Sequence, residues 1–208
     1  MFKIKAKNYS QHTGKMQGIR SINSNPLSNP FCIHMSKKEN SICSKCYSRD
    51  MLLSGFRKSC IQPWEDMGKL LSEDLLDISE IKPCPNTKYI RFSSAGELIN
   101  LTHFENFIQI AKVNNQSVCT LFTKRKDILR QLKQEIPQNM IVVYSNPYLD
   151  RPLYEKDIPE KANKIFNVFT REYANEHGIS INCGSKKCKE CMVCYSQNNI
   201  NVINELIK

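Results

Sequence analysis

Apolar and polar positions alternate between two periods in the second half of the chain, which predicts β-strands separated by α-helices. The predicted strands are residues 88–94, 117–123, 141–145, 164–170 and 179–182. The helices between them carry apolar faces at Leu101, Phe104, Ile108 and Ala111, and at Ile128, Leu129 and Leu132, with a short helix at 171–177. The last strand is expected to lead directly into Cys183.

The first half is less regular. Weak alternation around Ile19 and Ile22 predicts a strand at residues 18–24, after an irregular arm at 1–17. The segment NPLSNP then breaks regular structure, so we expect Cys32 in a loop. One helix is predicted from Tyr47 to Phe56. A second is predicted after Pro63, with an apolar face that continues through Trp64, Met67, Leu70, Leu71, Leu75 and Ile78.

This order of elements predicts an α/β fold built from parallel βαβ units. Six strands are too few for an eightfold barrel, so we expect either a partial (β/α)6-type barrel or an open parallel sheet. A single domain should span residues 1–208, with a β/α core at 18–182 and a cysteine-rich, metal-binding segment at 183–208. Functional groups should gather at the carboxyl ends of the strands.

Composition indicates a cytoplasmic protein that binds no membrane. The N-terminus has no signal-peptide pattern, and the longest apolar run, residues 140–144, is too short to span a bilayer. The formal charge is +10, from 30 basic and 20 acidic residues. This surplus suggests an anionic partner: nucleic acid, an anionic lipid or a phosphorylated ligand.

The ten cysteines point to metal binding, because disulfides rarely persist in a reducing compartment. Seven of them form two sets. The C-terminal set lies in CGSKKCKECMVCY and comprises Cys183, Cys188, Cys191 and Cys194. The N-terminal set is sparser and comprises Cys32, Cys43 and Cys46. The remaining three, Cys60, Cys84 and Cys119, are expected to be ordinary small buried residues.

The spacing of the C-terminal set favours a [4Fe–4S] cluster over zinc. Zinc ribbons pair two separate CxxC knuckles, whereas Cys188, Cys191 and Cys194 overlap as CxxCxxC, like the run of three in bacterial ferredoxins. Zinc remains the alternative. Thiolate–metal centres are usually anionic, and we expect nearby lysines to compensate that charge: Lys186, Lys187 and Lys189 in this set, and Lys37, Lys38 and Lys45 in the other.

The N-terminal set has only three cysteines within range, which leaves three hypotheses open. A cluster held by three thiolates keeps one iron free to bind a substrate or cofactor. Alternatively, His34 or Cys60 supplies a fourth ligand. In a third arrangement, Cys43 and Cys46 share a zinc ion with two C-terminal cysteines.

Polar side chains at other predicted strand ends are candidates for cofactor binding. After residues 88–94, the small residues Ser94 and Gly96 allow close backbone approach, and Glu97 can accept a hydrogen bond from an amine or hydroxyl. Cations at two further strand ends, Lys124, Arg125 and Arg171, can hold a phosphate or carboxylate. The structural alternatives are that the residues after 88–94 form an ordinary βα turn and that the three cations are solvated charges at the starts of helices.

These features together resemble the phage and plasmid "gene product 88" domain family. The resemblance covers roughly residues 15–195, and the matching positions are Cys32, Cys43, Cys46 and Tyr47; Arg91, Ser94, Gly96 and Glu97; Phe122, Thr123, Lys124 and Arg125; and the closing C…CxxCxxCY. It implies a phage or mobile-element protein, active in the host cytoplasm, with no settled activity.

The chain also resembles, more distantly, the radical S-adenosylmethionine enzymes. Those enzymes have a partial barrel, a three-cysteine cluster after the first strand and a GGE-like turn that holds the methionine amine, which corresponds to Gly96 and Glu97 here. S-Adenosylmethionine is the further cofactor that this resemblance implies. The family's CxxxCxxC is replaced here by C-x10-C-x2-C.

Three functional hypotheses follow. The first is an iron–sulfur redox enzyme with an open cluster on Cys32, Cys43 and Cys46 and one or two clusters in total. The second is a zinc- or cluster-stabilised nucleic-acid-binding protein without catalysis, in which Tyr47 and Tyr195 offer stacking faces. The third is an iron–sulfur redox sensor that acts on a protein partner.

Overall fold

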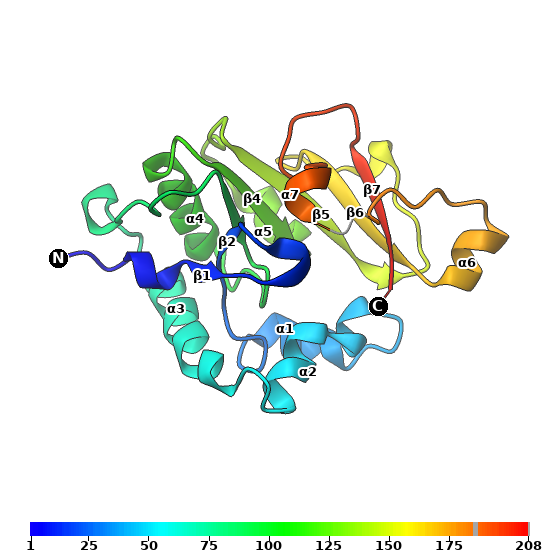
Figure 1. Cartoon of the computed structure of the whole chain (residues 1–208), viewed down its shortest axis with the longest axis horizontal. Coiled ribbons are helices and arrows are strands. Elements are labelled where there is room, and N and C mark those ends of the chain that lie inside the picture. Colours follow the sequence, from blue (N-terminus) through cyan, green and yellow to red (C-terminus); the bar gives the residue numbers. More distant parts are fainter. Residues whose placement is uncertain (185–186, 208) are drawn as a thin grey trace.

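A computed structural model describes residues 1–184 and 187–207 (Figure 1). The protein has an α/β fold with a seven-strand, mostly parallel open sheet. Strand order follows the sequence; β1 pairs antiparallel with β2, and every other pair is parallel. The strands are β1 (Ser10–Gln11), β2 (Arg20–Ile22), β3 (Tyr89–Phe92), β4 (Val118–Thr123), β5 (Met140–Leu149), β6 (Lys164–Phe169) and β7 (Val202–Leu206).

The helices are short, apart from two that pack on the sheet. They are α1 (Pro30–Ser36), α2 (Tyr47–Leu53), α3 (Ile61–Glu73), α4 (Leu101–Val113), α5 (Lys126–Gln131), α6 (Arg171–Glu176) and α7 (Cys188–Cys191). Six 3-10 helices join them: η1 (Ala6–Asn8), η2 (Gly14–Met16), η3 (Ile42–Lys45), η4 (Lys58–Cys60), η5 (Ile78–Glu80) and η6 (Glu155–Asp157). Helices α1 and α2 lie together below the strands in Figure 1.

Alternate side chains of the strands point to opposite faces of the sheet, and the two faces differ. On the outer face, residues such as Phe92 and Leu121 join α3, α4 and α5 in the main core, where the rings of Phe92 and Phe107 stack 4.4 Å apart. On the inner face a smaller cluster forms from Phe122, Ile141 and Val143, with Phe166 and Cys194 packed against it. The C-terminal cysteine segment therefore covers the inner face.

The sheet is strongly curved. Lys15, in η2 between β1 and β2, places its Nζ 2.8 Å from Oε1 of Glu205 in β7. Five inter-strand steps separate β2 from β7, which is about 24 Å in a flat sheet at about 4.8 Å a step. Two side chains do not span that distance, so the sheet curls until its two sides approach each other.

Most of the predicted strands are confirmed, and the sheet extends beyond them. Residues 18–24, 88–94, 117–123 and 164–170 contain β2, β3, β4 and β6, and residues 141–145 lie within β5, which runs from Met140 to Leu149. The strand predicted at 179–182 is wrong: the final strand is β7, after the cysteine segment. Both Ile179 and Ile181 remain partly exposed, whereas Ile203 of β7 is fully buried. Residues 182 and 183 instead donate backbone hydrogen bonds to Asn204 O along β7.

Three other predictions need correction. The arm at 1–17 is not irregular, since it forms η1, β1 and η2 and buries Ile4 and Tyr9 in the main core. Cys32 lies in α1 rather than in a loop, because Asn29 caps the helix through Phe31 N and Cys32 N. Helix α3 begins before Pro63 and ends at Glu73, short of the predicted Ile78. Within the described residues, no helix is long and apolar enough to cross a membrane.

Candidate metal centres

The segment that carries the N-terminal cysteine set crosses the carboxyl ends of β3, β4 and β5. At one end, Asn29 Nδ2 donates to Glu97 O at 2.8 Å, beyond β3. At the other, Ser41 Oγ donates to Pro147 O at 3.0 Å in β5, and Leu149 N donates to Asn40 O at 3.1 Å. Helix α1 and η3 are thus fixed over the end of β4, where parallel-sheet proteins commonly place their functional groups.

This placement gathers three thiols, one carboxylate and one ammonium group. Burial raises the pKa of the Cys32 thiol, and the negative charges of Glu97, Cys43 and Cys46 raise it further, while Lys124 opposes them. Burial would lower the pKa of Lys124, but the charges of Cys43, Glu97, Cys32 and Cys46 raise it overall. The structure therefore brings the three predicted cysteines together with two of the predicted cofactor-binding residues.

Glu97 is 2% exposed and holds the end of β4 in place. Its Oε1 accepts from Thr123 Oγ1 at 2.7 Å and Leu98 N at 2.8 Å, and its Oε2 accepts from Lys124 N at 2.8 Å. The carboxylate thus fixes the backbone of Lys124 as well as carrying charge into the site. Apart from the backbone N–H of Lys124, no described group donates a hydrogen bond to Oε2.

Gly96 is required by packing against the β2–β3 connection. Its φ is +78°, and an added Cβ would collide with the hydroxyl and backbone carbonyl of Ser24. Gly96 is predicted to let a ligand approach the backbone closely. In the structure it lets Ser24 of the same chain approach closely instead.

The other predicted polar residues lie in separate surroundings. Ser94 Oγ donates to Asn23 Oδ1 at 2.6 Å. The guanidinium of Arg125 donates to Leu98 O and Ile99 O, both at 3.0 Å, and pairs with Asp127. Arg171 is exposed at the start of α6, and among the described residues no hydrogen bond or ion pair involves its side chain. Only Lys124 of the three predicted cations faces the N-terminal set.

The C-terminal set lies on the inner face of the sheet. Thr120 Oγ1, in the middle of β4, donates to Cys194 O at 3.1 Å. Lys15 Nζ lies 3.5 Å from Cys183 Sγ. The ring of Tyr195 meets that of Tyr89 edge-on, with centroids 5.7 Å apart. These contacts anchor the segment to η2, β3 and β4.

The four thiols of this set lie within electrostatic range of one another. Burial raises the pKa of Cys194 to about 12; the charge of Arg91 opposes this, and the charges of the other three cysteines add to it. Burial also raises the pKa values of Cys183 and Cys188. The charge of Glu205 raises both pKa values further, and the charge of Lys15 opposes this. The charges of the four thiols therefore influence one another.

A strained turn shapes this segment. Met192 adopts φ +58° at the end of α7, between Cys191 and Cys194. Met192 N donates to Cys188 O and Tyr195 N donates to Met192 O, both at 2.9 Å. A left-handed conformation costs a residue with a Cβ about 1–2 kcal/mol. The two successive tight turns therefore hold Met192 in a backbone conformation that this residue type disfavours.

Among the described residues, the cations that influence the thiols of this set are not the predicted lysines. Lys187 and Lys189 are exposed, and Lys187 pairs with Glu190 at 3.8 Å; Lys186 lies outside the described residues. The cations that affect the thiols are Arg91, Lys15 and Lys164. Alternation along β3 could have indicated Arg91, since it is the charged residue in an otherwise apolar strand, but Lys15 and Lys164 carry no local signal.

The remaining predicted residues behave in different ways. Cys84 and Cys119 are buried, and Cys60 packs against the small cluster of Leu52, Trp64 and Ala95. His34 is exposed. Tyr195 is 3% exposed, so the prediction that it offers a stacking face is wrong, whereas Tyr47 is 66% exposed.

The donor chemistry of both sets fits a soft metal centre, since clustered thiolates bind zinc or iron–sulfur clusters. Within residues 1–184 and 187–207, no three His, Cys, Asp or Glu side chains already adopt metal-binding geometry. The two sets have different neighbours, Lys124 and Glu97 for one and Arg91 and Lys15 for the other. Nothing in these contacts supports a zinc ion shared between them.

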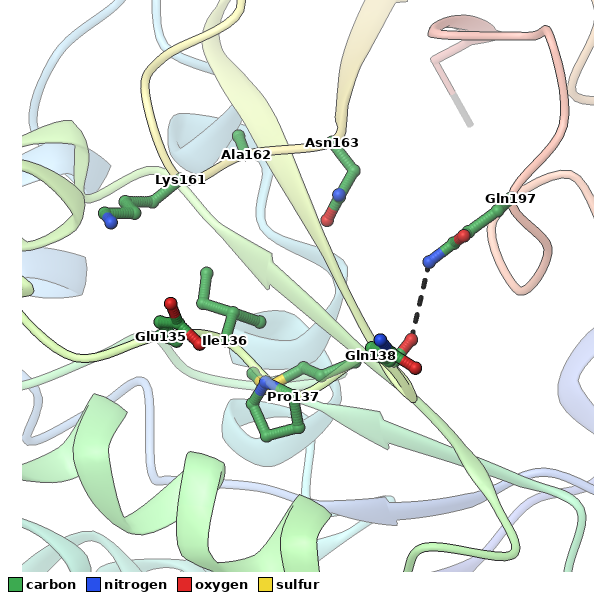
Figure 2. A pocket seen from close by; sticks show the side chains of 9 residues that line it. Glu135, Ile136, Pro137, Gln138, Lys161, Ala162, Asn163 and Gln197 are labelled. Carbon is green, nitrogen blue, oxygen red and sulfur yellow. Dashed lines mark hydrogen bonds between the residues drawn. The ribbon is translucent and has the colours of Figure 1, made fainter.

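A pocket of about 360 Å³ lies away from both sets, at the amino end of β5 and beside the connection into β6 (Figure 2). Gln197 Nε2 reaches across it to Gln138 O at 3.4 Å. A second pocket, of about 430 Å³, is lined by residues that include Leu153, Phe169 and Val202. Neither pocket is lined by a cysteine.

No protein-family model, curated protein or solved structure significantly matches this chain.

Proposed function

We propose that this chain is a phage or mobile-element iron–sulfur protein whose N-terminal cysteine set forms an open redox site. The carrying observation is the convergence of Cys32, Cys43 and Cys46 on Lys124 at the carboxyl end of β4. A [4Fe–4S] cluster bound there through three thiolates would supply electron transfer and one iron free for a ligand. The thiolates needed for this are provided by two different elements, α1 and η3.

The protein's own groups around this site favour binding an anionic group. Lys124 presents an ammonium group beside the three sulfurs, and Glu97 holds the backbone of Lys124 at 2.8 Å. Helix α1 and η3 cover the strand ends and limit the access of water. A carboxylate or phosphate on a substrate can pair with Lys124, as expected for a charge-assisted hydrogen bond in a partly buried site.

The curved sheet supports the partial (β/α)6-type barrel as the architecture of this site. The ion pair of Lys15 with Glu205 brings the two sides of the sheet together, and the C-terminal cysteine segment covers the enclosed face. In such a barrel the N-terminal set occupies the mouth and the C-terminal set occupies the interior.

Metal analysis of anaerobically purified protein tests this proposal. We expect iron and acid-labile sulfide, with visible absorbance that Cys46→Ala diminishes and Cys119→Ala leaves unchanged. Cys119 is a fair control because it is fully buried on the outer face, away from both sets. A colourless protein with stoichiometric zinc and no sulfide would contradict the proposal.

S-Adenosylmethionine is the cofactor candidate for the open iron, on the strength of the radical-enzyme resemblance. Glu97 already accepts three hydrogen bonds from the protein, so the cofactor would have to add to these contacts rather than replace them. Addition of S-adenosylmethionine to the reduced protein should change its electron paramagnetic resonance spectrum. An unchanged spectrum would remove this cofactor from the proposal while leaving the cluster in place.

A nucleic-acid-binding function is the second candidate, favoured by an exposed surface on α2 and the turn that follows it. Tyr47 is 66% and Phe56 80% exposed, and Lys45 and Lys58 flank them in sequence and are exposed too. Exposed aromatic rings beside cations suit single-stranded nucleic acid. Salt-sensitive binding of a single-stranded oligonucleotide that weakens in Tyr47→Ala would support this function, and salt-independent retention would argue against it.

A further inference from the structure

Two cations on the inner face, the partly buried Arg91 and the buried Lys164, have no carboxylate partner among the described residues. Arg91 places its guanidinium carbon 3.8 Å from the centroid of the Phe122 ring. Its Nη1 lies 4.0 Å from Met16 Sδ, its Nε is buried without a hydrogen bond, and the phenol of Tyr195 lies beside it. These described neighbours of the guanidinium are neutral.

Lys164, at the start of β6, is the second of these cations. Lys164 is 2% exposed, and its Nζ donates to Asn198 Oδ1 at 2.8 Å and to Ile200 O at 2.6 Å. Both acceptors are neutral. Asn198 and Ile200 belong to the segment that follows Cys194, so the lysine is held directly beside the cysteine set.

Lys15 adds a third positive charge from η2. Its Nζ contacts Cys183 Sγ at 3.5 Å and Glu205 Oε1 at 2.8 Å. Glu205 is the single carboxylate that the described contacts place here. Three cations against one carboxylate leave a surplus of two positive charges around the four cysteines.

A buried charge without a counter-charge costs several kcal/mol, and folded proteins avoid this by pairing it. Four neutral thiols would leave the surplus uncompensated. A divalent metal ion, or an oxidised [4Fe–4S] cluster, bound by four thiolates is dianionic and matches that surplus.

Tyr195 supplies a second indication of a missing acceptor. It is 3% exposed, and its hydroxyl lies beside Arg91, but no described group accepts a hydrogen bond from it. The charges of Arg91, Cys194 and Cys188 act on the pKa of this phenol, so Tyr195 lies beside the same thiols. A buried hydroxyl rarely lacks a partner, and a metal-bound thiolate sulfur would accept from it.

We propose that the C-terminal set holds a dianionic tetrathiolate metal centre, neutralised by Arg91, Lys164 and Lys15, with Tyr195 Oη donating to one of its sulfurs. These four residues are positioning residues: they fix the charge and geometry of the centre. The inference deepens the proposed function but needs only metal at the C-terminal set, not catalysis at the N-terminal one.

Zinc affinity tests the charge match directly. Zn²⁺ is titrated against a chromophoric chelator in a Cys43→Ser, Cys46→Ser background, so that the C-terminal set alone is measured. Arg91→Met and Lys164→Met should each weaken binding about 10- to 100-fold, the usual effect of losing an outer-shell partner. Lys88→Met is the control: it removes the same charge from an exposed residue directly before β3 and should change affinity less than twofold.

Stability with and without zinc separates this role from simple packing. Arg91→Met should lower the urea midpoint of the zinc-loaded protein but preserve or raise that of the metal-free protein, where the cation is uncompensated. Equal losses in both forms would overturn the proposal, as would unchanged zinc affinity in both variants. If the metal-free protein does not fold, the affinities alone decide.

The outcomes are distinguishable from those of the proposed function. Zinc affinity that depends on Arg91 and Lys164 supports this inference even if the N-terminal set proves to bind no iron. Conversely, an iron–sulfur site at Cys32, Cys43 and Cys46 can stand if the C-terminal set binds zinc without regard to these cations.

Discussion

Lys15 Nζ lies 2.8 Å from Glu205 Oε1, although 190 residues separate the two in sequence. The pair joins the β1–β2 connection to β7 and therefore holds the curvature of the whole sheet. Burial alone would lower the pKa of Lys15, but its hydrogen bond with Glu205 and that carboxylate's charge raise it overall. Lys15 therefore stays protonated across the neutral pH range.

Removing the carboxylate should loosen β7. We expect Glu205→Gln to lower the free energy of unfolding by about 1.5–3 kcal/mol, the range for hydrogen bonds to charged groups. Amide hydrogen exchange should accelerate first in residues 202–206. Glu190→Gln is the control, because its pair with Lys187 is long, at 3.8 Å, and mostly exposed; a similar loss in both variants would contradict a special role for Glu205.

Gly96→Ala should destabilise the protein far more than Gly55→Ala. Both glycines have positive φ, +78° and +82°, so both variants carry the left-handed backbone cost of about 1–2 kcal/mol. Only at Gly96 does the new Cβ collide with Ser24, which adds about 1–3 kcal/mol of overpacking. Urea denaturation of the pair measures the difference, and equal midpoints would show that the β2–β3 connection yields.

The protein should lose stability as pH falls from about 6.5 to about 4. Burial, assisted by the charges of Arg91 and Arg57, lowers the pKa of His12 from 6.5 to about 4. Between these values the unfolded chain binds a proton that the folded chain does not, so acid favours unfolding, by up to about 3 kcal/mol at this one residue. Burial lowers the pKa of His103 to about 3, which acts in the same direction.

His12→Asn isolates the first contribution. The variant loses the 2.6 Å contact between His12 Nε2 and Ser21 Oγ, which shifts its stability at every pH. The informative quantity is the slope: between pH about 6.5 and 4 the variant should depend less on pH than the parent. Parallel stability curves, measured by urea denaturation, would contradict the assignment.

Lys124→Met should weaken metal binding at the N-terminal set selectively. Loss of the ammonium group leaves the charge of the three thiolates and Glu97 uncompensated, so we expect about 10- to 100-fold lower metal affinity there. Metal at the C-terminal set should be retained. Lys112→Met, on the exposed side of α4, controls for the change of net charge; equal losses at both sets would point to a general defect in folding.

The sequence predicts the fold best where its periodicity is strongest. Strands β3, β4 and β6 and helix α4 are long apolar repeats, and they lie where the pattern put them. Residues 179–182 show the limit: they alternate strictly and residues 202–206 do not, but tertiary packing buries Ile203 and leaves Ile181 partly exposed. Only packing decides which of these two short segments joins the sheet.

Spacing in the sequence predicts the two cysteine sets, because metal-ligating cysteines commonly lie close together in a chain. It does not predict their neighbours. The lysines nearest in sequence to the C-terminal set are exposed, while the cations around it come from η2, β3 and β6. Such convergence depends on sheet order and curvature, which no local pattern encodes.

The position of the C-terminal set before β7 has a consequence for biosynthesis. A ribosome makes the cysteine segment before residues 202–206, so the inner face, with Phe122, Ile141 and Val143, stays uncovered until that segment has crossed it. A nascent chain short of metal would display this apolar surface to chaperones and to other nascent chains. If the C-terminal set binds metal as proposed, the supply of metal during translation would then influence how much protein accumulates in the cell.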